Sequence, residues 1–196
     1  MSEQMIVKPT ADGIAAAASA AAKGKGLPPV HKWNPPDCGD LDIRIARDGM
    51  WYYLGTPFGR PELVRLFSTI LRKDGDKYYL VTPVEKVGIT VEDVPFLAVD
   101  FEVTGEGETQ RLTFHTSVGD STTAGPDAPI RVVRDPDTGE PSPYVLVRAN
   151  LEALIDRKSF YRLVDIGTHH PVDSISWFGV WSGGQFFPII PSAELP

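Results

Sequence analysis

Three things are scarce in this sequence: cysteine, long apolar runs and basic charge. A single cysteine, Cys38, excludes an internal disulfide framework. Because no apolar run is long enough to span a bilayer as a helix, we expect a cytoplasmic protein without a membrane partner. The 19 Lys and Arg residues are outnumbered by 26 Asp and Glu, for a formal net charge of −7 at pH 7. Such a chain lacks the basic field that attracts phosphate backbones, so we expect no nucleic-acid partner.

Catalytic and cofactor-binding motifs are missing as well. The chain has no Gly-x-x-x-x-Gly-Lys phosphate loop, no Gly-x-Gly-x-x-Gly, no Gly-x-Ser-x-Gly elbow and no His-Glu-x-x-His pair. His169 and His170 are the only local histidine cluster, and we interpret them as an exposed loop pair before Pro171. Neighbours on a strand would point to opposite faces and share no metal ion unless the chain turns there. The sequence therefore identifies no cofactor and no metal site.

Paired carboxylates are the one pattern that leaves room for an enzyme. They occur at Asp37, Asp40 and Asp42 and again at Glu92 and Asp93, and a general acid–base pair could lie among them. Surface carboxylates more often cap turns or face solvent. An enzyme of unrecognised type remains an alternative.

The most regular pattern in the chain runs from Ile43 to Thr82. Asp48-Gly49 separates two runs of β-branched and aromatic residues, which predicts a hairpin with a two-residue turn. Apolar residues at helical spacing then predict one amphipathic helix that begins near Pro61, buries Phe67 and continues to residues 72–73. Residues 77–82 follow as a closing strand.

A trimmed copy of this pattern begins at Ile130. Both copies share the spacing Ile-Arg-x-x-Arg-Asp. We align Leu151, Leu154 and Ile155 with the helix residues Leu63, Leu66 and Phe67 of the first copy. Asn150 is predicted to be the N-cap of the second copy's helix, and residues 160–164 are predicted to form its closing strand. The sequence thus predicts a sheet-rich α+β protein with two similar lobes that arose by internal duplication. Two unrelated units patterned by the same physics are the alternative.

This pattern divides the chain into three parts. Residues 1–32 are predicted to be an alanine-rich tail or a loosely docked helix with a linker, residues 33–127 the first α+β lobe, and residues 128–196 the second. Residues 175–181 are compatible with a strand or with a helix turn, and periodicity does not decide.

Several motifs of the first lobe are specific in combination. They are Gly49-x-Trp51-Tyr52-Tyr53, Thr56-Pro57-Phe58-x-Arg60-x-x-Leu63-Val64-x-Leu66-Phe67 and Asp76-x-Tyr78-x-Leu80-Val81-Thr82-Pro83-Val84-Glu85-Lys86. From about residue 33 to 184 the chain resembles the bacterial family named domain of unknown function 1285. The resemblance implies a duplicated α+β core, a C-terminal half similar to a pleckstrin-homology-like barrel, a ligand site between the halves and a part in signalling. It implies no activity.

The candidate site comes from a difference between the copies. The first lobe has six residues, 55–60, between its strand and its helix, where the second has only two. An arginine beside a helix N-terminus is suited to phosphate or carboxylate, and glycines let the backbone approach a ligand. We therefore predict an anion site at Thr56, Gly59, Arg60 and Lys86, facing the cleft between lobes, with Trp51 or Tyr53 available to stack. Alternatively, Arg60 pairs with a carboxylate of its own lobe and the loop only seals it.

Three function classes follow, in order of preference. The first is a non-enzymatic module that binds a small anionic molecule, such as a nucleotide, in a cleft between lobes, because clefts between domains are where small molecules usually bind. The second is the enzyme of unrecognised type. The third is a protein-interaction module with exposed sheet edges. The sequence does not give the oligomeric state.

Overall fold

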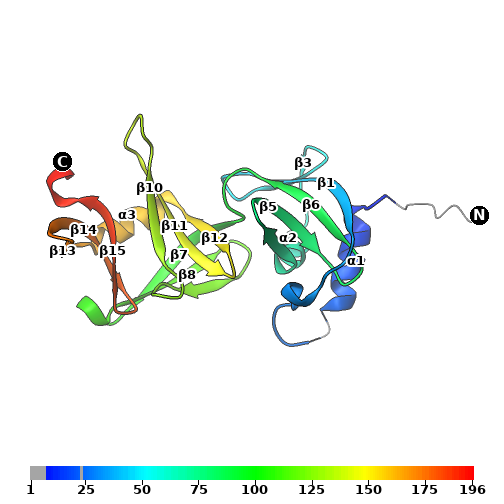
Figure 1. Cartoon of the computed structure of the whole chain (residues 1–196), viewed down its shortest axis with the longest axis horizontal. Helices are drawn as coiled ribbons and strands as arrows, with labels where there is room; N and C mark the ends of the chain where they lie inside the picture. The colour runs from blue at the N-terminus through cyan, green and yellow to red at the C-terminus, as the bar shows by residue number, and fades with distance from the viewer. Residues whose placement is uncertain (1–7, 23) are drawn as a thin grey trace, which may run out of the picture. The chain divides into compact units, whose positions relative to one another are not determined.

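The computed structural model describes residues 8–22 and 24–196, and the chain divides after Asp93 into two units (Figure 1). It is sheet-rich and of the α+β class, as expected. The division lies earlier in the chain than the boundary expected at residues 127 and 128. The physical reason is strand pairing, because residues 96–123 form three strands of the C-terminal sheet.

The N-terminal unit is built on one six-stranded sheet in the order β3-β2-β1-β6-β5-β4. Only β1 and β6 run parallel; the other neighbours are antiparallel. Its strands are β1 (Asp37–Ile45), β2 (Trp51–Tyr53), β3 (Thr56–Pro57), β4 (Leu71–Asp74), β5 (Lys77–Val81) and β6 (Lys86–Val91).

The predicted hairpin is confirmed as β1 and β2, but its turn is longer than expected. Ile45 pairs with Trp51, and the Ala46 N–H donates to the Met50 carbonyl at 2.9 Å. Three residues therefore form the turn, and Gly49 takes the left-handed conformation with φ of 85°. This is the usual three-residue solution, a turn closed by a left-handed glycine.

Helix α2 (Pro61–Thr69) begins at Pro61 as predicted and leaves Phe67 with 0% exposure. Its predicted end at residues 72–73 is wrong. Residues Leu71–Asp74 form β4, which pairs with β5 across a turn at Gly75 and Asp76. The apolar run continued the helical spacing by chance, and pairing with a distant strand overrode it.

Helix α1 (Ala11–Ala21) packs against α2, which answers the question of tail or docked helix for this stretch. The Thr10 hydroxyl caps it by accepting a hydrogen bond from the Gly13 N–H at 3.1 Å. Ile14 and Ala18 lie on its buried face. Residues 1–7 of the expected tail lie outside the described residues. No helix in the described part of the chain is long and apolar enough to cross a membrane.

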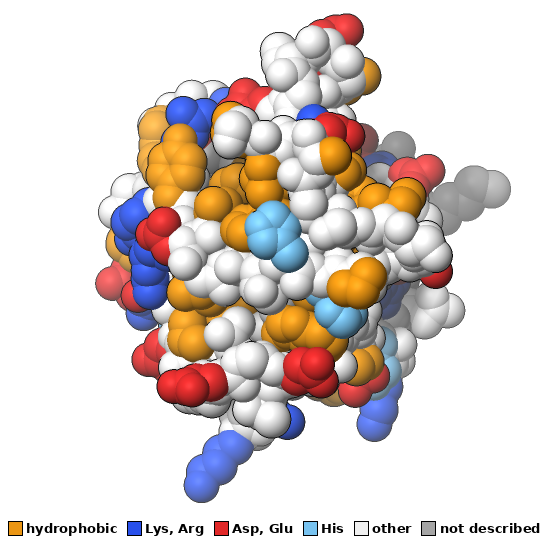
Figure 2. Space-filling view, turned by 90° about the vertical axis from the view of Figure 1, so that its left-hand side faces the viewer, with side chains coloured by type: hydrophobic (Ala, Val, Ile, Leu, Met, Phe, Trp, Pro, Cys, Tyr) orange, Lys and Arg blue, Asp and Glu red, His pale blue; other side chains and the backbone are white. Residues whose placement is uncertain are grey.

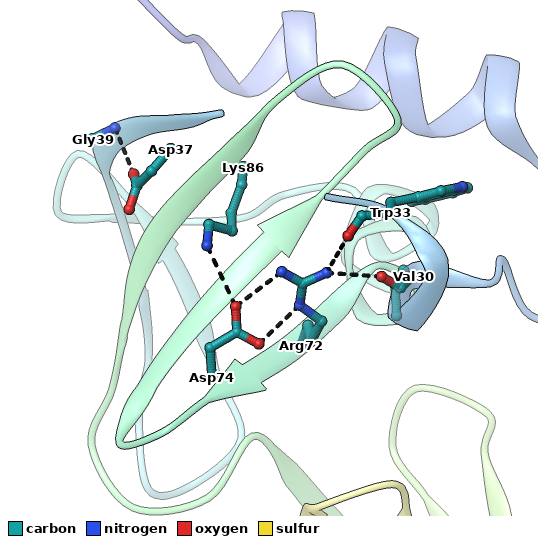
Figure 3. A network of polar contacts seen from close by, with 7 residues as sticks. All are labelled: Val30, Trp33, Asp37, Gly39, Arg72, Asp74 and Lys86. Atoms are coloured by element: carbon teal, nitrogen blue, oxygen red, sulfur yellow. Dashed lines mark hydrogen bonds and ion pairs between the residues drawn. The ribbon is translucent and has the colours of Figure 1, made fainter. Parts of the chain in front are cut away.

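The linker after α1 is fastened to the sheet by one arginine. Arg72 on β4 donates to the carbonyls of Val30 and Trp33 at 2.9 and 2.7 Å; Val30 is the first residue of the 3₁₀ turn η1 (Val30–Lys32), and Trp33 follows its last (Figure 3). The same guanidinium makes two hydrogen bonds of 2.9 Å to Asp74. The clamp ties the chain entering β1 to the edge strand β4.

The C-terminal unit contains a second six-stranded sheet, a helix and a three-stranded meander. The sheet has the order β10-β11-β12-β7-β8-β9, with β7 and β12 parallel. Residues 175–181, left undecided above, lie in a strand. The elements are β7 (Phe96–Thr104), η2 (Gly107–Thr109), β8 (Arg111–Thr116), β9 (Ser121–Thr123), β10 (Ile130–Arg134), β11 (Pro141–Arg148), β12 (Leu151–Ile155), α3 (Arg157–Asp165), β13 (Thr168–Val172), β14 (Ile175–Ser182), β15 (Gln185–Pro191) and η3 (Ser192–Glu194).

The predicted alignment of the two copies is wrong after the hairpin β10–β11. Residues Leu151–Ile155 form a strand in which every second residue is buried, rather than a helix. The helix starts later, at Arg157. Its N-cap is Asp156, whose carboxylate accepts a hydrogen bond from the Ser159 N–H at 2.8 Å, and not Asn150. Residues 160–164 lie inside this helix and not in a closing strand. A five-residue apolar run fits either period, so spacing alone misassigned it.

Candidate functional site

An open pocket of about 210 Å³ lies in the N-terminal unit beside the loop that leads into α2. Three segments line it: the start of α1, the end of β2, and the stretch from β3 to the first turn of α2. The lining residues are Ala11, Asp12, Tyr53, Thr56, Pro57, Phe58, Gly59, Arg60 and Leu63.

A tight turn places Tyr53 and Thr56 opposite each other. They pair across Leu54 and Gly55, which have φ angles of 50° and 78°. Positive φ at both central residues is the mark of a type I′ turn, whose backbone twist matches that of the two strands it joins. The two central residues of such a turn are usually Asn-Gly. Leucine at the first position is strained and its side chain is 66% exposed. The turn is thus held by its surroundings, including a 3.0 Å hydrogen bond from the Leu54 N–H to the Asp42 carbonyl.

Aromatic rings form the pocket wall behind this turn. Phe58 stacks on Tyr53 with ring centroids 6.1 Å apart and meets Phe67 edge-on at 5.8 Å. Trp51 lies farther inside, 3% exposed and stacked on Phe67. Tyr53 and Phe58 therefore face the pocket, whereas Trp51 supports them from the core and does not line it.

Arg60 is the N-cap residue of α2 and is exposed. Within residues 8–22 and 24–196 its guanidinium has no ion pair or hydrogen bond. Glu62 and Asp93 are the two carboxylates that were expected to compete for it. Asp93 pairs with Arg47 at 3.1 Å, and Glu62, in the first turn of α2, forms no ion pair with Arg60 in the described part of the chain. The guanidinium is thus available to a ligand.

The helix terminus itself offers less than expected. Pro61 has no N–H, and the N–H groups of Leu63 and Val64 already donate to the Arg60 carbonyl at 3.1 and 3.4 Å. Few backbone donors remain for an anion, so any anion binding at this pocket depends on the Arg60 side chain.

Asp12 brings a negative charge to the same pocket. It lies in the first turn of α1, where a carboxylate is favourable to the helix dipole. No ion pair joins Asp12 to Arg60 in the described structure. One cation and one anion therefore face the pocket without neutralising each other.

Lys86 belongs to a different network. Its ammonium lies 3.4 Å from Asp74 (Figure 3). The same ammonium lies 4.5 Å from the centre of the Tyr79 ring. Hydrogen bonding from Arg72 lowers the pKa of the Asp74 carboxyl, and Lys86 lowers it further against the opposing effect of burial. Lys86 does not line the pocket, so the predicted cationic pair of Arg60 and Lys86 is not formed there.

The predicted site is thus divided by the structure. Tyr53, Thr56, Gly59 and Arg60 line the pocket, and Trp51 and Lys86 do not. Sequence reasoning missed Ala11, Asp12 and Leu63. For Ala11 and Asp12 the sequence did contain a signal: the capping residue Thr10 is followed by Ile14 and Ala18, which lie one helical turn apart. This pattern would have predicted a helix with one buried face.

Most of the carboxylates considered for catalysis are engaged in this fold, whereas Asp42 is exposed. Asp40 pairs with Lys77 at 2.6 Å, and Asp37 accepts a hydrogen bond from the Gly39 N–H at 2.9 Å. Glu92 and Asp93 hold Arg44 and Arg47. Among the residues that the structure describes, no group of three or more His, Cys, Asp or Glu is placed to hold a metal ion.

Two histidines make hydrogen bonds to serines. His115 Nδ1 lies 2.8 Å from Ser121 Oγ, and Glu102 lies 3.7 Å from His115 Nε2, too far for a hydrogen bond. Glu102 is 72% exposed, so water competes for every member of this row. His169 lies in strand β13 and not in the expected loop, with Nδ1 2.8 Å from Ser192 Oγ. Neither arrangement provides a buried general base.

Two family models match the chain side by side. Residues 28–94 match "Domain of unknown function (DUF1285), N-terminal domain", and residues 95–189 match "Protein of unknown function (DUF1285), C-terminal domain". These bounds agree with the division at Asp93.

Two solved structures are similar to this chain. A DUF1285 family protein from Silicibacter pomeroyi DSS-3 has 61% sequence identity and a TM-score of 0.84, over 94% of this chain and 98% of that one. A DUF1285 family protein from Shewanella baltica OS155 has 33% identity and a TM-score of 0.50, over 63% and 90%. No curated protein matches the chain.

Proposed function

Because the chain belongs to the DUF1285 family, whose name assigns no activity, we propose its function from the pocket: the N-terminal unit binds a small organic anion, without transforming it, as a regulatory or signalling input. The observation that carries this proposal is the exposed guanidinium of Arg60, which lines the pocket and pairs with no other described residue.

The size and the charges of the pocket restrict which ligands would fit it. Pockets for drug-sized ligands usually measure about 300–1,000 Å³, and this one is smaller, at about 210 Å³. A compact anion is therefore favoured over a whole nucleotide. Asp12 would repel a dense polyanion, and it favours a molecule whose far end carries a hydrogen-bond donor or a cation.

Fewer observations support the other proposals. An enzyme remains the weaker alternative, because most of its candidate carboxylates are held in ion pairs and turns. Internal duplication is supported by a shared strand order of the two six-stranded sheets, in a different alignment from the one predicted. The pleckstrin-homology-like character of the C-terminal half rests on the family resemblance alone.

A thermal-shift screen of small carboxylates, phosphates and amino acids, followed by calorimetric titration, tests the proposal. We expect at least one compound to stabilise the chain, and Arg60→Ala to abolish that stabilisation while leaving the melting temperature without ligand nearly unchanged. Arg65→Ala is the matched control, since Arg65 is exposed on the same helix and does not line the pocket. Equal stabilisation of wild type and Arg60→Ala by every hit would overturn the proposal.

A further inference from the structure

The three-stranded sheet β13-β14-β15 has one buried face and one that faces solvent. Val180 and Phe187 pair across β14 and β15 and are 1% and 2% exposed. The next pair along, Trp181 and Phe186, is only half-buried and points the other way, because side chains alternate along a strand. We call this outer surface the aromatic face; it comprises His170, Ile175, Trp177, Trp181, Phe186 and Pro191.

Three rings of the aromatic face touch one another. The His170 ring centre lies 4.8 Å from Trp181 and 4.9 Å from Phe186, and the last two are 5.5 Å apart. Gly179 allows this closeness, because a Cβ there would come within 2.1 Å of the Phe187 carbonyl oxygen and 2.8 Å of the Phe186 ring. Hydrophobic side chains gather around histidines on the side of the molecule where β13 to β15 lie (Figure 2).

Buried hydrogen bonds hold the aromatic face to the sheet of its own unit. Ser182, with 0% exposure, donates to the Ala124 carbonyl at 2.7 Å and accepts from the Leu112 N–H at 2.9 Å. The Gln110 side chain donates to the Trp181 carbonyl at 2.9 Å. A surface fixed in this way loses little conformational entropy on binding.

The aromatic face carries no formal charge and offers only a few hydrogen-bond donors. Strands β13, β14 and β15 contain no Asp, Glu, Lys or Arg, in a chain of which 23% is charged. The indole N–H groups of Trp177 and Trp181 have no hydrogen-bond partner among residues 8–22 and 24–196. A complementary partner therefore carries no charge at the contact and offers acceptors to these two donors.

An added β-strand does not fit this surface. The free edge of β13 contains Pro171, which has no N–H to offer to a neighbouring strand. A sugar would bring many hydroxyl groups against a face with few polar partners, which costs free energy. A polyproline II helix fits better, because its carbonyls are not used internally and its flat proline rings pack on aromatic side chains.

We propose that the aromatic face binds an uncharged, proline-rich segment of a partner protein in the polyproline II conformation. Proline rings of the segment pack on Trp181, Phe186 and Trp177, and its carbonyls accept hydrogen bonds from the two indole N–H groups. This site is independent of the pocket at Arg60.

Nuclear magnetic resonance of the full chain tests this proposal with end-blocked decaproline as the probe. We expect the indole N–H signals of Trp177 and Trp181 to shift saturably, and those of Trp33 and Trp51 to stay in place. Trp181→Ala should weaken binding by about tenfold or more, the loss of a single hot-spot contact. If the alanine variant fails to fold, Trp181→Phe takes its place. This variant keeps an aromatic ring but lacks the N–H, so we expect it to weaken decaproline binding by less than the alanine variant would.

Tyr161→Ala is the control, since Tyr161 is an aromatic residue of α3 with 59% exposure outside the aromatic face. It should bind decaproline like the wild type. Three results would each refute the proposal: no saturable shift at millimolar decaproline, an equal shift with a blocked Gly-Ser peptide of the same length, or full binding by folded variants at Trp181. Binding of cellohexaose or phosphatidylcholine vesicles at these indoles in place of decaproline would do so too.

Discussion

The two six-stranded sheets share a strand order but place their helix at different points. The N-terminal order is β3-β2-β1-β6-β5-β4, and the C-terminal order, written from its other edge, is β9-β8-β7-β12-β11-β10. In each sheet the strand that comes first along the chain lies beside the one that comes last and runs parallel to it. Helix α2 joins the third strand to the fourth in the first sheet. In the second sheet residues 124–129 make that connection and α3 follows the sixth strand. One strand order thus tolerates a helix at either of two points.

The pocket occurs where the helix is inserted. Phe58, Gly59 and Arg60 are the residues through which β3 enters α2. The corresponding connection of the C-terminal unit closes on itself, with Gly125 and Ala128 bridged and Ala124 1% exposed. We therefore expect the small-anion site in one unit only.

The largest expected effect on stability comes from truncating the deeply buried aromatic side chain of α2. Phe67→Ala removes a ring with 0% exposure that packs on Trp51, and we expect a loss of about 3–5 kcal/mol in unfolding free energy. Urea unfolding followed at the Trp51 indole signal measures it within the N-terminal unit. Tyr161→Ala on the exposed side of α3 should change stability by no more than about 0.5 kcal/mol. An unchanged urea midpoint for Phe67→Ala would show that α2 is not seated as described.

The second prediction compares two arginines that each make two hydrogen bonds to a carboxylate. Arg72 also binds two backbone carbonyls, whereas Arg131 pairs with Glu152 at the surface with 49% of its side chain exposed. We expect Arg72→Ala to cost about 2 kcal/mol and Arg131→Ala less than about 1 kcal/mol, because only the first leaves shielded carbonyls unpaired. Chemical denaturation of both variants checks this, and equal costs would argue against the clamp.

A third prediction concerns acid. A carboxyl whose pKa is lower in the folded state stabilises the fold above its ordinary pKa and loses that contribution as the pH falls through the lowered value. Asp74 is such a group, through Arg72 and then Lys86. Asp74→Asn should therefore flatten the fall in melting temperature between about pH 4 and pH 2.

Asp135 in the C-terminal unit serves as the comparison for that acid titration. The backbone N–H groups of Thr138 and Asp137 lower its pKa, but it lies in an exposed turn. We expect a smaller change from Asp135→Asn, since solvent screens the exposed turn. A larger change than for Asp74→Asn would mean that the Arg72 network contributes little.

The smallest effect is a gain. Leu54→Asn places the preferred residue before Gly55 in a turn that needs two positive φ angles, and should raise stability by about 0.5–1 kcal/mol. Thermal unfolding measures it, with the exposed Val84→Asn as a control that removes an apolar side chain without changing a turn of this type. A lower melting temperature for Leu54→Asn would show that the leucine side chain stabilises the fold.

Local patterns predicted the local elements well. The hairpin before Leu54 followed from Asp-Gly between strand-forming runs, the start of α2 from Pro61, and the burial of Phe67 from helical spacing. Each of these signals lies within a few residues of the feature that it predicts, so distant parts of the fold did not change the outcome.

Long-range pairing was what the sequence did not reveal. The motif shared by β1 and β10 suggested that these strands correspond, whereas the strand orders match β1 with β7. Lys86 was placed near Arg60, but pairing with β5 carries it to the Arg72 and Asp74 network. Asp12 reaches the pocket only because α1 docks on α2, a contact that no local pattern encodes.

The most direct test of the pocket is chemical-shift mapping of a confirmed small-anion ligand on the labelled full chain. We expect the perturbed amides to lie in residues 11–12 and 53–63, with residues 124–129 unchanged, and we expect Arg60→Ala to remove these shifts. Perturbations confined to other residues, or an unchanged pattern in Arg60→Ala, would contradict this prediction.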